Sequence, residues 1–421
     1  MTSCIVINCL NYHMQRIKLF RKIILIYLLP LSSFAQLKEI SIGPVFEEPE
    51  SGYAKIVEMK NGNTFYIHIT PKDGINIRIY DPNHKEKVVS NFIPAFGELG
   101  KFDEVEAVFE QNNNILLFVN WAEDFYPSLI RITIDGNSGR IKQEKIIASL
   151  KTQWKPSAWV NYDPPHFFLV RTDTKSGNYA IGVRHNSRTV YTKKDDVLKP
   201  AEIIHFGNNN TELYRKDILF QNSSNIRCTL NDFVVVGEKV FAYTTNSMAN
   251  YKHDHYLTTI DKAGYQFKKI DILDKVSIEY SIFRYNASAD NFVFLIAEYI
   301  ESKREKKYGI LLFLVEHSGE GRKIPDFGIS EQTQEEYTSS IEKKEVFQGM
   351  IQDLVINDDS SFTVFYEEMM AIRNDSGNGT ELGVVVASTY SHDGKRLSEY
   401  LVPKMHFTIN TLLRPLYLYY R

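Results

Sequence analysis

A hairpin that recurs six times constrains the fold of this chain more than any other feature of the sequence. Each copy contains a strand, a turn rich in Asp, Asn, His or Gly, and a second strand. Asp and Asn suit such turns because their side chains bond the nearby backbone, and Gly adopts positive φ freely. The polar residues that open the six turns are Asp81, Asp135, His185, Asp261, Glu316 and Asp393.

The fullest copy of the repeat lies at Ile351–Pro403 and reads as four strands. These strands are Asp353–Ile356, Phe362–Tyr366, Leu382–Thr389 and Arg396–Val402. Two strand-like runs also precede each of the other five hairpins, for example first and second strands at Ala158–Tyr162 and Phe167–Thr172 in the third unit, and at Asp232–Val236 and Val240–Thr245 in the fourth. A meander of four antiparallel strands is typical of a propeller blade or of part of a sandwich, and its repetition favours the blade. Two stacked β-domains are the alternative arrangement.

The sequence therefore predicts an all-β propeller of six four-stranded blades, or seven. The predicted units are 53–93, 104–150, 158–198, 232–273, 278–325 and 351–403. The long interval Lys199–Asn231 is either an insertion or a degenerate seventh blade. The interval Gly328–Gly349 is the second candidate insertion, with a solvated loop or short surface helix at Ser330–Gln348. Two segments are available to close the ring, Leu37–Ile42 and His406–Tyr420.

The first 35 residues have the pattern of a secretory signal peptide. Four basic residues precede an apolar run, Ile23–Leu31, and small residues stand before a cut at Gln36. The run is too short to span a bilayer. We expect a signal peptide over 1–35, with Met14 as an alternative start, and one propeller domain over 36–421. The mature protein is then periplasmic or extracellular and has no transmembrane segment.

Charge and cysteine content exclude some classes of function. The chain has 49 basic and 52 acidic residues, and removing residues 1–35 takes away four basic ones, which moves the net charge from −3 to −7. Nucleic-acid partners favour clustered Lys and Arg, so none is expected. One cysteine, Cys228, remains after the leader, so no internal disulfide can form.

At this level the chain resembles the uncharacterised exported propeller-like proteins of Gram-negative bacteria. The resemblance rests on the leader ending Phe34–Ala35–Gln36, on the six hairpins, and on the late Asp393–Gly394 and Val402–Pro403–Lys404. It covers the mature chain and concerns architecture. No function is established for that group, so the resemblance implies no catalytic residue.

Polar and aromatic loops predict a binding rim. In a four-stranded blade the loops from the second strand to the third open on one rim, and ligand sites concentrate on loops held by a rigid scaffold. We expect a non-catalytic module that binds a glycan or a protein partner there. The alternatives are ordinary solvated loops and aromatic packing between blades. The candidate contact residues are Trp121, Asp124, Tyr126, Arg171, Asp173, Tyr251 and Tyr299.

An enzyme is the alternative function. Glu298, Glu367 and Glu368 each end a predicted second strand and could supply the carboxylate pair of a glycoside hydrolase. The alternative is that they are ordinary solvated carboxylates, as carboxylates near strand ends usually are. The sequence contains no Gly-x-Ser-x-Gly, His-Glu-x-x-His, P-loop or Rossmann glycine pattern, which favours binding.

A pair of histidines is the candidate metal site. His253 and His255 alternate along a predicted strand, so both imidazoles can share one face and bind a divalent metal with a carboxylate from another blade. A chance His-x-His run is the alternative. No other cofactor is predicted.

Overall fold

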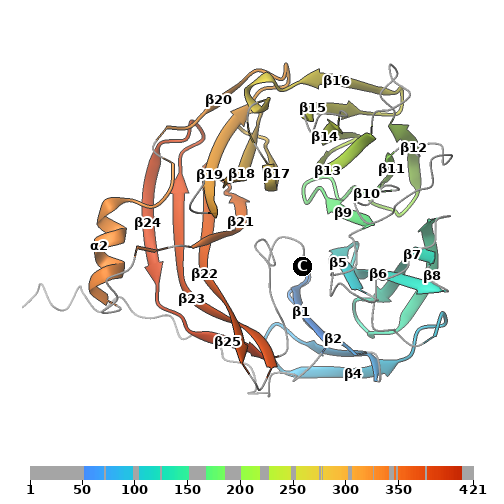
Figure 1. The fold of residues 1–421 in the computed structure, drawn as a ribbon. Helices are drawn as coiled ribbons and strands as arrows, with labels where there is room; N and C mark the ends of the chain where they lie inside the picture. The colour runs from blue at the N-terminus through green and yellow to red at the C-terminus, as the bar shows by residue number, and fades with distance from the viewer. Residues whose placement is uncertain are drawn as a thin grey trace, which may run out of the picture.

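Six antiparallel sheets surround a central axis in this protein (Figure 1). The predicted all-β propeller of six four-stranded blades is therefore confirmed. The computed structural model describes residues 52–70, 73–97, 104–123, 126–150, 167–184, 201–218, 227–247, 253–274, 276, 278–301, 306–325, 327–340, 346–347, 349–374 and 377–409. The predicted signal peptide and Leu37–Ile42 lie outside these residues.

The first strand of each blade is innermost and the fourth lies at the outer edge (Figure 1). Blade 1 contains β1 (Tyr53–Glu58), β2 (Thr64–Thr70), β3 (Gly74–Tyr80) and β4 (Glu86–Phe92). Blade 2 contains β5 (Glu104–Gln111), β6 (Asn114–Glu123), β7 (Tyr126–Asp135) and β8 (Ile141–Ser149). Blade 3 contains β9 (Phe168–Thr172), β10 (Tyr179–Val183), β11 (Ala201–Phe206) and β12 (Glu212–Ile218).

The second half of the chain repeats this order. Blade 4 contains β13 (Arg227–Val236), β14 (Lys239–Ser247), β15 (His253–Ile260) and β16 (Tyr265–Lys269), followed by a 3-10 turn at Asp271–Leu273. Blade 5 contains β17 (Ile278–Asn286), β18 (Asn291–Glu301), β19 (Lys306–Val315) and β20 (Gly321–Lys323). Blade 6 contains β21 (Met350–Ile356), β22 (Phe362–Asn374), β23 (Gly377–Tyr390) and β24 (Arg396–Val402).

The turn chemistry that predicted the hairpins is visible in their hydrogen bonds. The Oδ1 atom of Asp81 accepts from the backbone N–H of Asn83 and Lys85, at 2.8 and 2.9 Å. Asp135 and Asp261 accept from turn N–H groups in the same way. These side-chain bonds fix the backbone of a tight turn, which explains why local sequence was sufficient to find it.

The third blade differs from its prediction. Phe168–Thr172 is the innermost strand, where a second strand was expected, and no described hairpin turns at His185. The outer hairpin instead turns at Gly207–Asn210, where Asn210 has φ of 66° and Asn209 accepts from Thr211 N–H. The interval at 199–231 is therefore neither an insertion nor a seventh blade. It contains β11, β12 and the start of β13.

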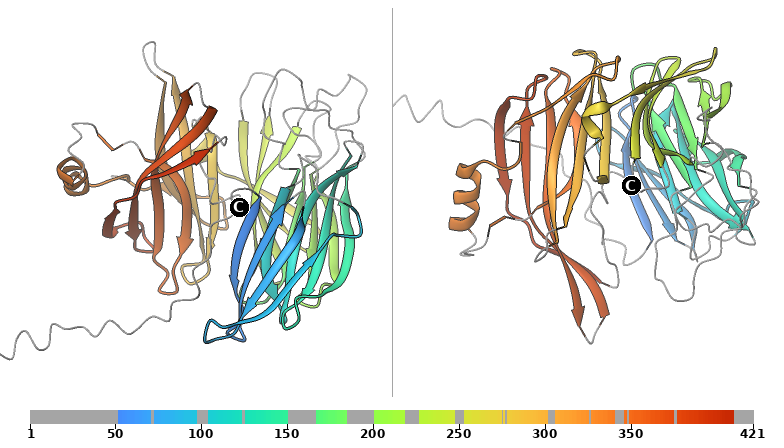
Figure 2. Two further views of the ribbon diagram at one scale, coloured as in Figure 1. Left: turned by 90° about the horizontal axis from the view of Figure 1, so that it is seen from below. Right: turned by 45° about the horizontal axis from the view of Figure 1, so that its top comes forward.

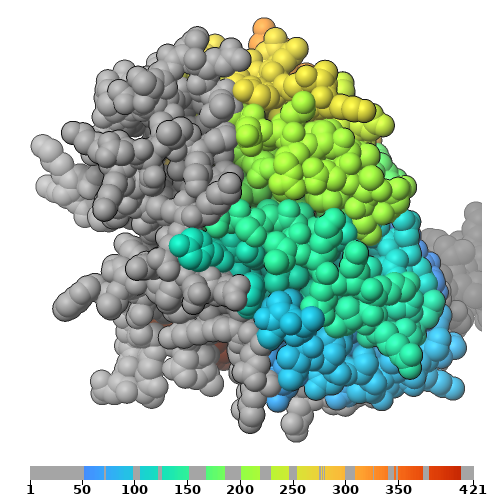
Figure 3. All heavy atoms as spheres, turned by 90° about the vertical axis from the view of Figure 1, so that its right-hand side faces the viewer, coloured from blue at the N-terminus to red at the C-terminus, as the bar shows by residue number. Residues whose placement is uncertain are grey.

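Apolar clusters join the blades in pairs. Five clusters of buried residues link blades 1 and 2, 2 and 3, 3 and 4, 4 and 5, and 5 and 6. Blades 1 to 4 follow one another as bands on the outer surface (Figure 3). No such cluster of described residues joins blade 6 to blade 1. Of the segments expected to close the ring, β25 (His406–Ile409) pairs with β23 of its own blade.

The interval before the sixth blade contains a short helix, α2 (Glu331–Ser340), on the outside of blade 6 (Figure 2). Ser330 Oγ accepts from the N–H of Thr333 at 3.1 Å and begins the helix in the usual N-cap manner. The helix is polar except for Tyr337, which is buried against Phe347. No helix in the described part of the chain is long and apolar enough to cross a membrane.

Candidate binding site

The predicted rim residues do not gather into one site among the described residues. Trp121 packs on Phe96, with ring centroids 5.7 Å apart. This contact agrees with the alternative that the aromatic residues pack between blades. Tyr126 is exposed at the start of β7. Tyr299 lies opposite Tyr308 in the backbone register of β18 and β19. Asp124 and Tyr251 lie outside the described residues.

Asp173 lies on the opposite rim from the one predicted. Because β9 is the first strand of its blade, Asp173 opens a first-to-second turn, where its Oδ2 accepts from Ser176 Oγ at 2.6 Å and from Gly237 N–H of blade 4 at 2.9 Å. Burial raises the pKa of Asp173, but these hydrogen bonds outweigh it and leave the pKa below its usual value. Asp173 thus ties two neighbouring turns together.

Two of the three candidate catalytic carboxylates have structural partners. Glu367 is buried and forms an ion pair with Lys404 Nζ. Glu368 accepts from the hydroxyl of Tyr337 and, at 3.3 Å, from the backbone N–H of Val384. Glu298 is half-buried on β18 opposite Gly309.

The candidate metal residue His255 is in the core, not on a rim. Its side chain is 3% exposed, and its Nδ1 lies 2.8 Å from the hydroxyl of Tyr243. Burial raises the pKa of that hydroxyl, which keeps it protonated. His253 pairs with Ser247 in the backbone register. Within the described residues, no three His, Cys, Asp or Glu side chains are placed to bind a metal ion.

Charged side chains do meet on the innermost strands of blades 3 to 6. We call Arg171, Asp232, Arg284 and Asp353 the inner charge array; they come from β9, β13, β17 and β21. Arg171 Nε donates to Asp232 Oδ1 at 3.0 Å, and Arg284 Nη2 donates to Asp353 Oδ1 at 3.2 Å. Asp232 is 2% exposed, whereas Arg284 and Asp353 are 25% and 28% exposed, so solvent reaches one side of the array.

The array is one electrostatic unit. Burial lowers the pKa of Arg284, while the charges of Asp232 and Asp353 oppose that effect and the charge of Arg171 adds to it. Asp232 therefore interacts electrostatically with a guanidinium group from each neighbouring blade, Arg171 of blade 3 and Arg284 of blade 5. Two positive and two negative groups leave the array without net charge.

Two buried acceptors in this region have no donor among the described residues. They are Oδ2 of Asp232 and Oε1 of Gln352, whose side chain is fully buried. Asp232 follows a β-bulge in β13, and Gln352 occupies one in β21. Bulges re-aim side chains beside functional sites, and a buried acceptor without a donor costs about 1–3 kcal/mol.

The array was missed because its members look like ordinary strand residues. Arg171 was assigned to a second strand and a rim loop, and Asp232 and Asp353 opened predicted first strands. The available signal was a charged residue in a mainly apolar first strand, and it is the single charge in Phe168–Thr172 and in Met350–Ile356. That pattern identifies an inner site only when it is known which strand of each blade is the first.

Comparison with known proteins finds distant similarity to solved structures and assigns no family. No family model and no curated protein matches the sequence. Among solved structures, the propeller domain of the Trilobed protease from Pyrococcus furiosus is 10% identical, covering 84% of this chain and 97% of its own at a TM-score of 0.40. An uncharacterised Listeria monocytogenes protein is 11% identical, with 87% of each chain covered and a TM-score of 0.40.

The polysaccharide lyase Uly1 is also similar, at 8% identity and a TM-score of 0.42, covering 90% of this chain and 94% of its own. Similarity this distant carries no argument about function. The six-bladed propeller rests on the sheet topology of the structure itself.

Proposed function

We propose that this protein is an exported, non-catalytic binding protein and that the inner charge array binds a neutral polyhydroxylated ligand, a glycan. The observation that carries the proposal is the pair of buried acceptors, Asp232 Oδ2 and Gln352 Oε1, beside partly exposed guanidinium and carboxylate groups. A ligand hydroxyl that donates to these acceptors removes the cost of leaving them unsatisfied.

The charge balance favours a neutral ligand over an ion. Two guanidinium groups and two carboxylates already compensate one another, so an added ion would bring an uncompensated charge into a partly buried site. A sugar hydroxyl can donate to these acceptors, and it adds no charge that the array would have to compensate.

Binding is favoured over hydrolysis by the environment of the carboxylates. A glycoside hydrolase needs two carboxyl groups free to act on the two sides of one bond. Glu367 is held by Lys404, and Glu368 is held by Tyr337 and Val384, so neither is free for such a role.

The test is calorimetric titration of the full chain with neutral and uronate-containing oligosaccharides. We expect heat from a neutral oligosaccharide and binding at least about tenfold weaker in Gln352→Met, because one good hydrogen bond contributes on the order of 1.4 kcal/mol. Gln111→Met is the matched control, since Gln111 is a buried glutamine on the innermost strand of blade 2.

Three results would contradict the proposal. The first is an equal loss of affinity in Gln352→Met and Gln111→Met. The second is tighter binding of uronate-containing than of neutral oligosaccharides, and the third is release of reducing ends from any bound sugar.

A further inference from the structure

The outer edge of blade 5 is left incomplete by its own fourth strand. β20 has three residues, whereas the fourth strands of the other described blades have five to nine. β20 pairs with Phe313–Val315 of β19, and a last bond runs from Ile324 N–H to Leu312 O at 2.8 Å. Pro325 has no N–H and ends the pairing. No described strand pairs with the outer edge of Lys306–Leu311.

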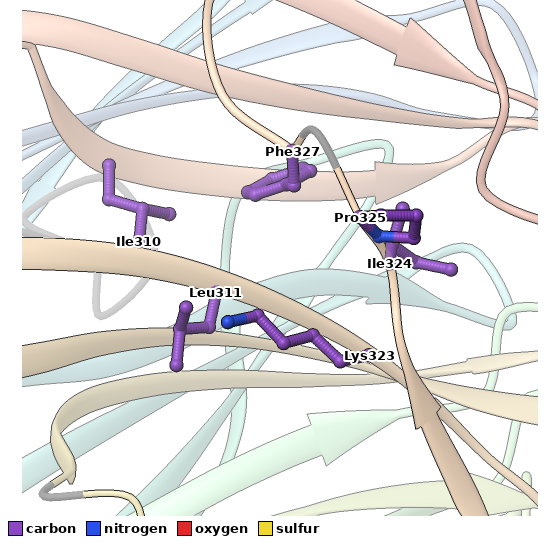
Figure 4. Close-up of a pocket in the computed structure, with 6 residues that line it drawn as sticks. All are labelled: Ile310, Leu311, Lys323, Ile324, Pro325 and Phe327. Atoms are coloured by element: carbon purple, nitrogen blue, oxygen red, sulfur yellow. The ribbon is translucent and has the colours of Figure 1, made fainter.

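An apolar pocket lies beside this open edge (Figure 4). Its volume is about 560 Å³, and its walls come from β19 and from the chain that leaves β20. Lys323 extends from β20 toward Leu311 and brings an ammonium group to the pocket. The residues that line it are Ile310, Leu311, Lys323, Ile324, Pro325 and Phe327.

The backbone of β19 is oriented to receive another strand. The carbonyl oxygen of Leu312 points away from β18, because it accepts from the N–H of Ile324. Backbone groups alternate in direction along a strand, so the N–H and C=O groups of Ile310 and Tyr308 also point away from β18. An extended peptide added to such an edge bonds to it through its main chain and places alternate side chains in neighbouring pockets.

Charge identifies the class of peptide. Arg322 and Lys323 are exposed on β20 at one end of the open edge. A peptide lying on this edge therefore meets cations beside the pocket. Acidic residues complement them, and an apolar side chain fits the pocket wall.

We propose that the outer edge of blade 5 binds an extended acidic peptide segment of a partner protein as an added β-strand, with an apolar side chain in the pocket and a carboxylate beside Lys323. This site is on the outside of the ring and is independent of the inner charge array.

Fluorescence anisotropy with four labelled hexapeptides tests the affinity. The probes are an alternating Glu and Leu peptide, its Lys and Leu counterpart, and the acidic peptide N-methylated at odd or at even residues. We expect the acidic peptide to bind, the basic one to fail, and one of the two N-methylation patterns to abolish binding while the other spares it. Binding that tolerates both patterns would overturn strand addition.

Hydrogen exchange on the full chain locates the bound peptide. We expect the amides of Tyr308 and Ile310 to exchange rapidly in the free protein and to gain at least about tenfold protection with saturating acidic peptide, because these N–H groups then bond to the added strand. The proposal is overturned if the peptide leaves the exchange of both amides unchanged. It is also overturned if both amides already exchange slowly in the free protein.

Lys323→Glu should weaken acidic-peptide binding at least about tenfold, since like charges then meet at the pocket. Lys262→Glu is the matched control, because Lys262 is exposed in the turn after β15. Equal effects of the two substitutions overturn the site. Sedimentation showing a dimer that Lys323→Glu dissociates would identify a second copy as the occupant and overturn the acidic partner.

Discussion

Blades 2 to 5 and blades 1 and 6 are built from the same meander but are buried differently. Blades 2 to 5 contribute to an apolar cluster on each of their two faces, whereas blades 1 and 6 contribute to one cluster each among the described residues. Exposed large apolar side chains are concentrated accordingly. Those on the strands of blades 1 and 6, including β25, are Ile56, Val89, Val355, Met370, Leu397, Tyr400, Val402 and Phe407.

The uncovered faces follow from the strand register. Cross-strand pairing aligns Ile56, Tyr66, Arg78 and Val89 across blade 1. In blade 6 it aligns Asp353, Phe365, Ala387 and Tyr400. In repeat proteins each unit is stabilised mainly by its neighbours. The difference therefore predicts that equivalent substitutions cost much more in blades 2 to 5 than on these two faces.

The largest expected effect is on a covered face. Leu117→Ala removes a fully buried side chain between blades 1 and 2 and should lower the free energy of unfolding by about 3 kcal/mol. Val402→Ala on the open face of blade 6 should change it by less than about 0.5 kcal/mol. Urea denaturation measures both, and similar costs would show that the two faces are equally packed.

The second effect concerns ion pairs. Arg171→Met leaves Asp232 buried without its guanidinium partner and should cost about 2 kcal/mol, less than a fully buried pair because Arg171 is partly exposed. Arg78→Met breaks an exposed pair with Glu86 on the open face of blade 1 and should cost less than about 0.5 kcal/mol. Denaturation at low and high salt should show screening in the second pair more than in the first.

A pH effect is expected from His205, which is buried between blades 3 and 4 and packs on Tyr214. Burial lowers its pKa below the usual 6.5, although Glu238 and Asp173 oppose that effect. The unfolded chain therefore takes up the proton first, and the stability contributed by neutral His205 is present above pH 6.5 and is lost as the pH falls toward the folded-state pKa.

The control for His205 is His205→Phe, which keeps a ring in place without a titrating group. Thermal melting at pH 7.5 and 5.5 should show a smaller loss of Tm in this variant than in the unsubstituted protein. An equal loss in both proteins would assign the pH effect to other groups.

The smallest effect on stability is expected from Tyr400→Ser, because that side chain is 64% exposed on the open face of blade 6. Its unfolding free energy should stay within about 0.5 kcal/mol of the unsubstituted value. Binding of a hydrophobic dye such as ANS should fall, since an exposed apolar patch loses its largest ring. Unchanged dye binding would indicate that this face is covered in solution.

Much of the fold could be predicted because turn chemistry is local. Asp81, Asp135 and Asp261 each bond to N–H groups two to four residues away, so a short stretch of sequence specifies each hairpin. The third blade was misread because His185 and Asn208–Asn210 are both plausible turns. The choice between them depends on how β10 and β11 pair, which is not a local property.

The sequence by itself determined that the chain forms repeated antiparallel meanders, because alternating apolar residues and turn residues act within a few positions of one another. Tertiary structure alone decided which strands are innermost and how Arg171, Asp232, Arg284 and Asp353 come together in the inner charge array. These features depend on contacts between residues about 60 or more positions apart, such as Arg171 with Asp232 and Arg284 with Asp353. No pattern within a single blade encodes such contacts.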